Sequence, residues 1–444
     1  MTSDWERQQA AAKCDEIIRF KPHGAESSYH NHQSARAEPN GRLKQVFGID
    51  NGFTNPNPAS QKPFIRKAEN LMLRAMNMKS SDSMEDEDWS SLRSQAINFF
   101  EEYMNRKSDE TVNLAELTQY IVLRQSLCYL FEGAAYALRN EDVFDDITFI
   151  GRRINELWIE SKTTSTISAD ELTWEKETDL HNALRRVTMP PMSGSFYGQF
   201  PIVEQVDPET PASNPMNLLL PAYETMWRIV LRCFLEVKHR GAHQGSVWTT
   251  VLLQYLEDLK DAKVIKPTAA FHRFTENGTN KVRPVEIVKE ALRLYPPTRR
   301  VHRMFDGEAQ SADIEGCQRS GLLGDTDPLI FIPERWQSIC EDERQAFYGI
   351  AAQSCTQLRY KNEKDRLRSA ETKQGYMPFG YFCAADHSST KEFASKMIAL
   401  LVAVLCHGLG DQWELEDPGS LPSTTTPLDS DRAAYEGLRL KRRG

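Results

Sequence analysis

The sequence predicts a mainly α-helical protein with a small β component, and three observations support that prediction. Apolar residues follow helical spacing over most of residues 88–186 and again after a Pro- and Gly-rich break at 189–198. The β-like runs are short and lie at 299–305, 328–333 and 437–443. No internal repeat or linker divides the chain, so we expect a single domain over residues 1–444.

The first 60 residues are expected to form a divergent, loop-rich segment. Residues 21–60 are rich in Pro, Gly, Asn, Ser and His, which favour turns and loops. The acidic run "SSDSMEDED" (80–88) predicts another loop just before the first strongly helical stretch.

Helical spacing then identifies most of the remaining elements. The predicted helices are 89–106, 113–138, 145–161, 214–240, 245–262, 283–295 and a final apolar helix that begins near Phe393. The stretch 214–240 contains Pro221, which removes one backbone hydrogen bond and therefore predicts a kink. The pair "PP" ends the helix at 283–295.

Composition and charge exclude several classes of protein. Hydrophobic residues make up 40% of the 444 and charged residues 26%, an ordinary composition for a globular protein. The formal net charge of -9 argues against a nucleic-acid partner. The eight cysteines are scattered without a CxxC pair, so we expect reduced thiols rather than a zinc site or a disulfide framework. Neither a transmembrane segment nor a signal peptide is visible.

Two stretches place charged residues where they could form one cluster. In "EALRLYPP", Glu290 and Arg293 stand three apart and share a helix face. In "DPLIFIPERW" (327–336), Arg335 follows an apolar run and could complete a buried Glu–Arg–Arg cluster, since buried charges need such pairing. The alternatives are a surface ion pair and a loop arginine.

A third stretch places a polar pair inside an apolar helix. In "LLLPAYETMWRIVLRCF" (218–234), Glu224 and Thr225 follow Pro221 by one turn. A kink with an acid and a hydroxyl is a suitable place to hold a water or dioxygen molecule. The alternative is a kinked core helix in which Thr225 bonds to its own backbone.

The fourth stretch, "PFGYFCAADHSST", places Cys383 in a loop before an apolar helix. Such a loop can hold a thiolate beneath a flat metal cofactor, where backbone N–H groups lower the pKa of the thiol. The alternative is a buried, inert thiol.

Taken together, in this order and spacing, the four stretches resemble the cytochrome P450 family, in particular its fungal members. "PAYET" is similar to the central-helix signature, "EALR" to the invariant helix pair, "PERW" to the meander and "PFG…C" to the haem loop. The resemblance is best over 214–444 and weaker over 41–213. No anchor helix is evident in residues 1–40, so the N-terminal part is expected to be shortened or divergent.

The resemblance implies a haem held by a cysteine thiolate, with Cys383 as its iron ligand. It also implies that Glu290, Arg293 and Arg335 form a structural cluster beneath the haem and that Arg303 pairs with a haem propionate. Glu224 and Thr225 would handle protons for dioxygen activation.

The function implied by the resemblance is that of a haem-thiolate monooxygenase. It would oxidise an apolar small molecule in fungal secondary metabolism, with electrons from NADPH delivered by NADPH-cytochrome P450 reductase. We expect a monomer in the cytoplasm or at the cytosolic face of the endoplasmic reticulum.

The haem loop departs from the family pattern. The family has seven residue steps from its Phe to its Cys, whereas Phe379 and Cys383 are four steps apart and the seventh step falls on Asp386. The second Gly and the basic residue are absent. Either the loop is re-gapped and Cys383 still reaches the iron, or the chain is a haem-free relative. A haem-free relative would be a cyclase or isomerase with Glu224 as its acid, a ligand-binding protein, or a non-functional product. We expect Cys383, rather than Asp386, to lie nearest the iron position.

Overall fold

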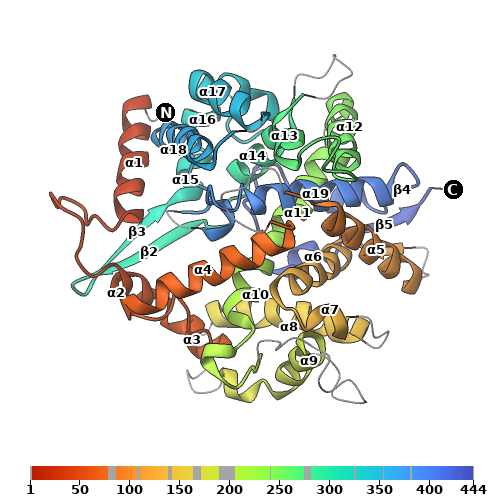
Figure 1. Cartoon of the computed structure of the whole chain (residues 1–444), viewed down its shortest axis with the longest axis horizontal. Helices are drawn as coiled ribbons and strands as arrows, with labels where there is room; N and C mark the ends of the chain where they lie inside the picture. The colour runs from red at the N-terminus through yellow and green to blue at the C-terminus, as the bar shows by residue number, and fades with distance from the viewer. Residues whose placement is uncertain are drawn as a thin grey trace.

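The computed structural model describes residues 3–78, 87–107, 111–138, 143–163, 172–189, 206–240, 242–274, 282–324, 327–353, 355–380 and 383–443. Helices dominate these residues and the strands are few and short, which confirms the predicted fold class (Figure 1). The predicted loop at 80–88 and the break at 189–198 lie largely outside the described residues.

The first half of the described chain is almost entirely helical. Its α-helices are α1 (Asp4–Ile18), α2 (His32–Ala37), α3 (Gly41–Phe47), α4 (Pro58–Ala75), α5 (Ser90–Arg106), α6 (Leu114–Leu130), α7 (Ala134–Ala137), α8 (Val143–Thr163) and α9 (Thr178–Thr188). Short 3-10 turns, η1 (Glu38–Asn40), η2 (Trp174–Lys176) and η3 (Pro211–Ser213), connect some of them.

The second half contains the remaining helices. They are α10 (Met216–Tyr223), α11 (Met226–Leu235), α12 (Ala242–Asp258), α13 (Pro267–His272), α14 (Pro284–Leu294), α15 (Ile314–Gln318), α16 (Gly321–Gly324), α17 (Glu341–Ala351), α18 (Gln357–Lys373) and α19 (Phe393–Leu409). A π turn, η4 (Glu236–Arg240), extends α11, and further 3-10 turns are η5 (Pro333–Gln337), η6 (Ala384–Asp386), η7 (Pro418–Ser420) and η8 (Arg432–Tyr435).

The strands form two small antiparallel sheets. β2 (Arg300–Phe305) and β3 (Glu308–Asp313) make a hairpin whose Asp306–Gly307 turn has positive φ at both residues, as a two-residue hairpin turn requires. The second sheet has the order β1-β5-β4 and joins β1 (Thr111–Asn113) to β5 (Arg439–Arg442) and β4 (Trp413–Leu415). Two of the three predicted β runs are therefore strands.

The helix α19 is the centre of the core. It packs against α5, α11, α12 and α14 and runs through the middle of the molecule in Figure 1. Nearly all of its side chains are buried, including those on opposite faces. An apolar helix of this kind is stable only when other elements surround it. The core cluster extends from Val46 in α3 to Leu440 in β5.

The predicted helix at 214–240 is broken at the predicted place. Pro221 lies inside α10, and Glu224 and Thr225 form the turn between α10 and α11. Because Pro221 has no N–H, the carbonyl of Asn217 lacks its usual helical donor. The side-chain amide of Asn51 donates to that carbonyl at 2.9 Å, so the loop after α3 is attached to the kink.

Three sequence-based predictions differ from the structure. Residues 21–60 contain α2 and α3 rather than loops alone. The run 328–333 is a turn that leads into η5, and not a strand. The helices α17 and α18 were not predicted, and α18 buries the stripe Tyr360, Lys364, Leu367 and Glu371. Because two of these four residues are charged, apolar periodicity could not indicate the buried face of α18.

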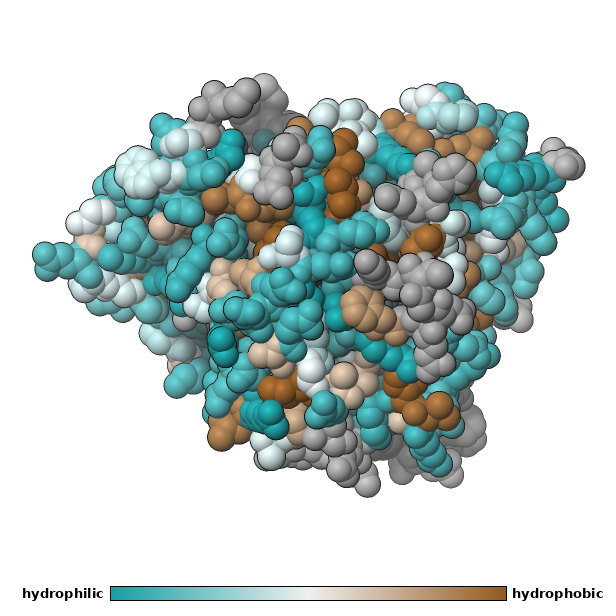
Figure 2. Space-filling model, turned by 90° about the horizontal axis from the view of Figure 1, so that it is seen from above, coloured by the Kyte–Doolittle hydropathy of each residue, from teal (hydrophilic) through white to brown (hydrophobic). Residues whose placement is uncertain are grey.

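The surface is mostly polar. On the face seen in Figure 2, hydrophobic residues lie in separate small groups among hydrophilic ones. None of the described helices is both long enough and apolar enough to cross a membrane.

Close packing of α19 on α5 generates a testable prediction. A Cβ added at Gly408 would overlap the ring of Phe100, which is itself buried. Gly408→Ala is therefore expected to lower the free energy of unfolding by about 1–3 kcal/mol, despite the better helix propensity of Ala. Urea denaturation followed by circular dichroism measures the effect.

The matched control is Gly349→Ala. Gly349 is an exposed position of α17 where an added Cβ meets nothing within 4 Å. The free energy of unfolding of that variant should rise by up to about 1 kcal/mol. Equal stabilities for the two variants would contradict the close packing of α19 on α5.

Candidate functional site

A buried carboxylate, Glu290 on α14, is the centre of a hydrogen-bonded cluster. Nε and Nη2 of Arg293 donate to its two oxygens at 2.9 Å each. Nε of Arg335 and the backbone N–H of Ile332 donate to Oε1, both at 2.9 Å. The indole N–H of Trp336 donates to Oε2 at 3.0 Å. The structure thus brings together the three residues that the sequence pairs, and each oxygen of Glu290 accepts at least two hydrogen bonds.

The guanidinium groups of the cluster are satisfied by backbone carbonyls as well. Arg293 is fully buried and donates to the carbonyls of Gln318 and Pro328 at 3.1 and 2.6 Å. Arg335 donates to the carbonyls of Asp327 and Ile330 at 3.0 and 3.1 Å. These bonds attach α14 to α15 and to the segment before η5.

The loop that carries Cys383 begins with a tight turn. The N–H of Gly380 donates to the carbonyl of Met377 at 3.0 Å, and Gly380 has a φ of 64°, which favours glycine. The N–H of Thr298 donates to the carbonyl of Pro378 at 3.3 Å, which holds the turn against the chain before β2. Gly380 therefore supplies the positive φ that the shortened loop needs.

Cys383 lines two cavities. One is apolar and has a volume of about 320 Å³, and the other is polar and has a volume of about 390 Å³. Burial and the nearby Asp386 carboxylate together raise the pKa of the thiol to about 11, although the backbone amides of Ala385 and Asp386 oppose the rise. The free thiol is neutral near pH 7, and a coordinated metal ion would deprotonate it.

The apolar cavity has Cys383 and the break between α10 and α11 in its wall. Other elements that contribute to the wall include α2, α3, α4, α6, α8, the loop after α3, the N-terminal part of α19 and residues 297–298. Representative apolar side chains in the wall are Leu43, Ile49, Phe64, Ile65, Leu218 and Ile229. A cavity of this size and lining suits an apolar small molecule or a flat cofactor.

Glu224 and Thr225 both line the apolar cavity, but their polar atoms have different partners. The Glu224 carboxyl is buried and accepts from the side-chain amide of Asn155 at 3.0 Å and from the indole of Trp227 at 3.4 Å. Burial raises the pKa of Glu224, and Arg228, at 3.9 Å, opposes the rise. The Thr225 hydroxyl donates to the carbonyl of Pro221 at 3.5 Å, which is long for a hydrogen bond and therefore weak.

Two buried cations stack on one aromatic ring near the cavity. The guanidinium carbon of Arg303 lies 4.4 Å from the ring centroid of Phe20, and that of Arg36 lies 5.2 Å from it. Burial lowers the pKa of Arg303 to about 9 and that of Arg36 to about 10. Among the described residues, neither has a carboxylate within ion-pair distance, and Nε of Arg303 has no hydrogen-bond partner.

The sequence singled out only one of these two cations. Arg303 is on β2 and donates to the carbonyls of His302 and Ile18 at 2.9 and 3.4 Å. Arg36 is on α2, lines the apolar cavity and donates to the carbonyl of Gly52 at 3.1 Å. Sequence reasoning missed Arg36 because α2 lies in the segment expected to be loop, where no motif marks it.

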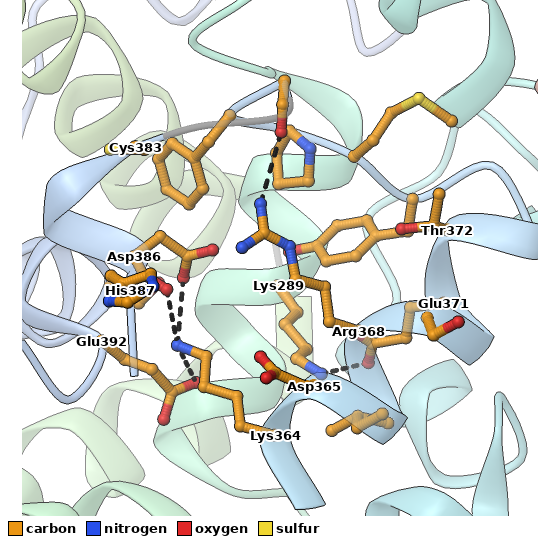
Figure 3. Close-up of a pocket in the computed structure, with 18 of the residues that line it drawn as sticks. Lys289, Lys364, Asp365, Arg368, Glu371, Thr372, Cys383, Asp386, His387 and Glu392 are labelled. Carbon is orange, nitrogen blue, oxygen red and sulfur yellow. Dashed lines mark hydrogen bonds and ion pairs between the residues drawn. The ribbon is translucent and has the colours of Figure 1, made fainter. Parts of the chain in front are cut away.

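The polar cavity lies on the other side of Cys383. Figure 3 shows Lys289, Lys364 and Arg368 around it together with several carboxylates. Lys289 forms an ion pair with Glu371, and Nζ of Lys364 is 3.5 Å from Asp386 and 3.9 Å from Glu392. Charges of both signs are thus paired along this wall.

The junction between the Cys383 loop and α19 is strained and buried. Lys391 and Glu392 have φ values of 46° and 60°, a conformation that costs about 1–3 kcal/mol for residues of this kind. The Glu392 carboxylate holds the junction in place, because His272 and Tyr360 bond to it at 2.8 and 3.0 Å. Burial alone would raise the pKa of Glu392, but Lys364 and His272 lower it below its ordinary value.

Side chains of α4 and α18 hold the segment between Cys383 and that junction in place. Ser389 donates to Glu69 of α4 at 2.8 Å, and His387 lies 3.3 Å from the same carboxylate. Lys364 of α18 donates to the carbonyl of Asp386 at 2.8 Å. Asp386 points toward the polar cavity and Lys364 (Figure 3), whereas Cys383 borders the apolar cavity as well.

Comparison with known proteins finds matches only among solved structures. No family model matches the chain. No curated protein matches it.

The solved structures that match are similar in fold to this chain. The haem domain of cytochrome P450DA has 15% identity and a TM-score of 0.49, over 98% of this chain and 85% of that chain. A triple variant of that domain has a TM-score of 0.45 at the same identity and coverage. Cytochrome P450EX alpha, solved with myristic acid, has a TM-score of 0.43 at 15% identity, over 97% of this chain and 86% of that chain.

The Glu290 cluster generates a prediction about folding. Glu290→Ala would leave two buried guanidinium groups without their carboxylate, which is expected to cost about 3–5 kcal/mol. We expect a large loss of soluble protein and a lower urea midpoint for what remains. Glu308→Ala, at an exposed position of β3, is the control and should change stability by less than about 0.5 kcal/mol. Normal yield and stability of Glu290→Ala would show that the cluster does not support the fold.

Proposed function

We propose that the chain is a haem-thiolate oxidoreductase that oxidises an apolar small molecule, with Cys383 as the iron ligand. One observation carries this proposal. Cys383 lies in the wall of an apolar cavity, the same cavity that the helix break at Glu224 and Thr225 lines. A bound haem would supply the redox centre at which dioxygen is activated.

The charges near the cavity fit the acidic groups of a haem. Buried guanidinium groups are normally paired with anions. Arg36 and Arg303 have no carboxylate partner among the described residues, and Nε of Arg303 is buried without an acceptor. Two propionates would satisfy both cations, and a buried polar atom without a partner calls for such an explanation.

The residues of this chain have distinct roles in the proposal. Cys383 would bind the metal through its sulfur, and the backbone amides of Ala385 and Asp386, which lower the pKa of the thiol, would favour its thiolate form. Burial shifts the Glu224 carboxyl toward its neutral form, so it is the proposed proton donor. The Thr225 hydroxyl, whose own hydrogen bond is weak, is available to accept and pass a proton within the cavity. The apolar side chains exclude water and orient the substrate.

The finer parts of the proposal rest on the sequence resemblance. They are a secondary metabolite as substrate, electrons from NADPH through NADPH-cytochrome P450 reductase, and a monooxygenase reaction. The apolar lining of the cavity supports an apolar substrate in general.

A second candidate function is a haem-free one, an isomerase or cyclase that uses Glu224 as its acid. The observation that favours it is the raised pKa of the buried Glu224 carboxyl inside an apolar cavity, the environment that makes a carboxylic acid a proton donor near neutral pH. The raised pKa of Cys383 is also that of an unliganded, neutral thiol. This candidate requires no metal at the sulfur.

The visible spectrum of the reduced protein with carbon monoxide separates the two functions. We expect the red-shifted Soret band of a thiolate-ligated haem in the wild type and in Asp386→Ala. Cys383→Ser should lose that band, because a serine oxygen cannot provide the sulfur ligand. Cys355→Ser, which changes another partly buried cysteine, should keep it.

Two results would decide against the haem-thiolate proposal. Retention of the thiolate-type band in Cys383→Ser would show that another residue ligates the iron. Absence of any Soret band from the wild type after reconstitution with haem would favour the haem-free function.

Thr225 generates a further prediction. Thr225→Ala is expected to keep the haem content but to divert electrons from product to hydrogen peroxide, because a hydroxyl that passes protons is lost from the cavity. The ratio of peroxide formed to NADPH consumed measures this. Thr250→Ala, at an exposed position of α12, is the control. An unchanged ratio would remove Thr225 from the proton path.

A further inference from the structure

Two cysteines that are 303 residues apart in the sequence meet outside the site described above. Sγ of Cys14 on α1 lies 3.3 Å from Sγ of Cys317 on α15, and one thiol donates a hydrogen bond to the other. Both side chains are almost fully buried, with exposed fractions of 7% and 8%. All eight cysteines are free thiols in the structure, so this pair is reduced.

Packing holds the two sulfurs side by side. They belong to a small hydrophobic cluster that also contains Ile17, Ile18, Ala312, Ile314 and Met377. Gly375 follows α18 with a φ of 87°, and a Cβ added there would lie 3.6 Å from Ala11 and 3.7 Å from Cys317. The backbone at Gly375 thus packs against both α1 and α15. These two helices cannot separate without breaking the cluster.

The hydrogen bond makes the two thiols unequal. It lowers the pKa of Cys14, because the Cys317 thiol donates to the Cys14 thiolate, and it raises the pKa of Cys317. The thiolate is the reactive form of cysteine. The direction of these shifts favours Cys14 as the sulfur that reacts first with an oxidant.

We propose that Cys14 and Cys317 form an oxidisable dithiol, a modification site that hydrogen peroxide converts into an intramolecular disulfide. The two sulfurs must approach by only about 1.3 Å to reach disulfide bonding distance. Hydrogen peroxide is small enough to reach a sulfur that is nearly buried. The proposal does not depend on haem or on the function proposed above.

The reaction takes place in two balanced steps. The Cys14 thiolate attacks one oxygen of hydrogen peroxide, the O–O bond breaks, and hydroxide leaves as Cys14 becomes a sulfenic acid. The Cys317 sulfur then attacks the Cys14 sulfur, the S–O bond breaks, and the departing hydroxide takes the thiol proton as water. Two thiols and one hydrogen peroxide give one disulfide and two waters.

The bond would join α1, which lines the polar cavity next to Cys383, to α15, which lies behind that cavity. Asp15, Ile18 and Arg19, at the end of α1, line that cavity. On the other side, the side chain of Gln318, next to Cys317, accepts from the N–H of Met377 at 2.8 Å, just before the turn that leads to Cys383. Oxidation would therefore fasten α1 to the element that holds the start of the Cys383 loop.

Peptide mapping without reductant tests the proposal on the full-length protein. After hydrogen peroxide treatment, we expect the peptides that contain Cys14 and Cys317 to be cross-linked, and dithiothreitol to separate them. Cys128→Ser, which changes a cysteine outside the pair, should give the same cross-link. The wild-type map alone decides whether the pair reacts, even where a variant folds poorly.

A pair of variants tests which sulfur reacts first. In Cys317→Ser, the serine hydroxyl still donates to Cys14, so peroxide should add oxygen to Cys14, which then has no resolving thiol. In Cys14→Ser, Cys317 should remain a thiol at the same dose. Oxidation of Cys317 and protection of Cys14 would overturn the assigned order.

The thermal midpoint provides an independent measurement. A cross-link that closes so long a loop is expected to raise the midpoint by roughly 3–5 °C in the wild type, and dithiothreitol should reverse the rise. Neither single variant of the pair should show it. The proposal is overturned if both cysteines stay reduced while Cys355 is oxidised, or if either forms its disulfide with another cysteine.

Discussion

The carboxylate of Glu290 is the interaction on which the arrangement of the site depends. It accepts hydrogen bonds from Arg293 on the same helix and from the backbone and side chains of residues 332–336, and it is completely buried. Its partner Arg293 reaches the carbonyl of Gln318 on α15, and Gln318 in turn holds the N–H of Met377. Burial of these charges is tolerable only when every one has its partners, so the segments cannot shift separately. The start of the Cys383 loop is fixed by that constraint.

The far end of the same loop is fixed by a second set of charges. Glu392 adopts a left-handed conformation directly before α19, and the strain is held by His272 and Tyr360. Lys364 bonds to Asp386 between the two ends. Both ends of the loop are fixed, and only four residue steps separate Phe379 from Cys383. The position of Cys383 is therefore restricted. This explains how Cys383 reaches the apolar cavity although its spacing from Phe379 is unusual.

The two sides of Cys383 differ in how their charged groups are paired. On the apolar side, Arg36 and Arg303 are buried without carboxylates in the described chain, which suits an anionic ligand. On the polar side, lysines and carboxylates are paired with one another, and the Cys14–Cys317 pair lies behind the wall. The apolar side therefore has the cations, unpaired among the described residues, that the proposed ligand requires. The polar side is built to hold α1, α15 and α18 together, and the proposed disulfide would add a covalent bond to that assembly.

The sequence alone determined the mainly helical fold class, the kink at Pro221 and the shared helix face of Glu290 and Arg293, because each depends on local spacing and backbone chemistry. It predicted Arg335 as their partner only through the family resemblance. It could not indicate α18, whose buried stripe contains Lys364 and Glu371, since apolar periodicity is blind to charges that are buried in pairs. Nor could it identify Arg36 or the contact between Cys14 and Cys317, which are brought to their partners by segments far apart in the chain. Whether a cysteine is a ligand, an inert thiol or half of a redox pair depends on what lies within a few ångströms of its sulfur, and only the tertiary structure decides that.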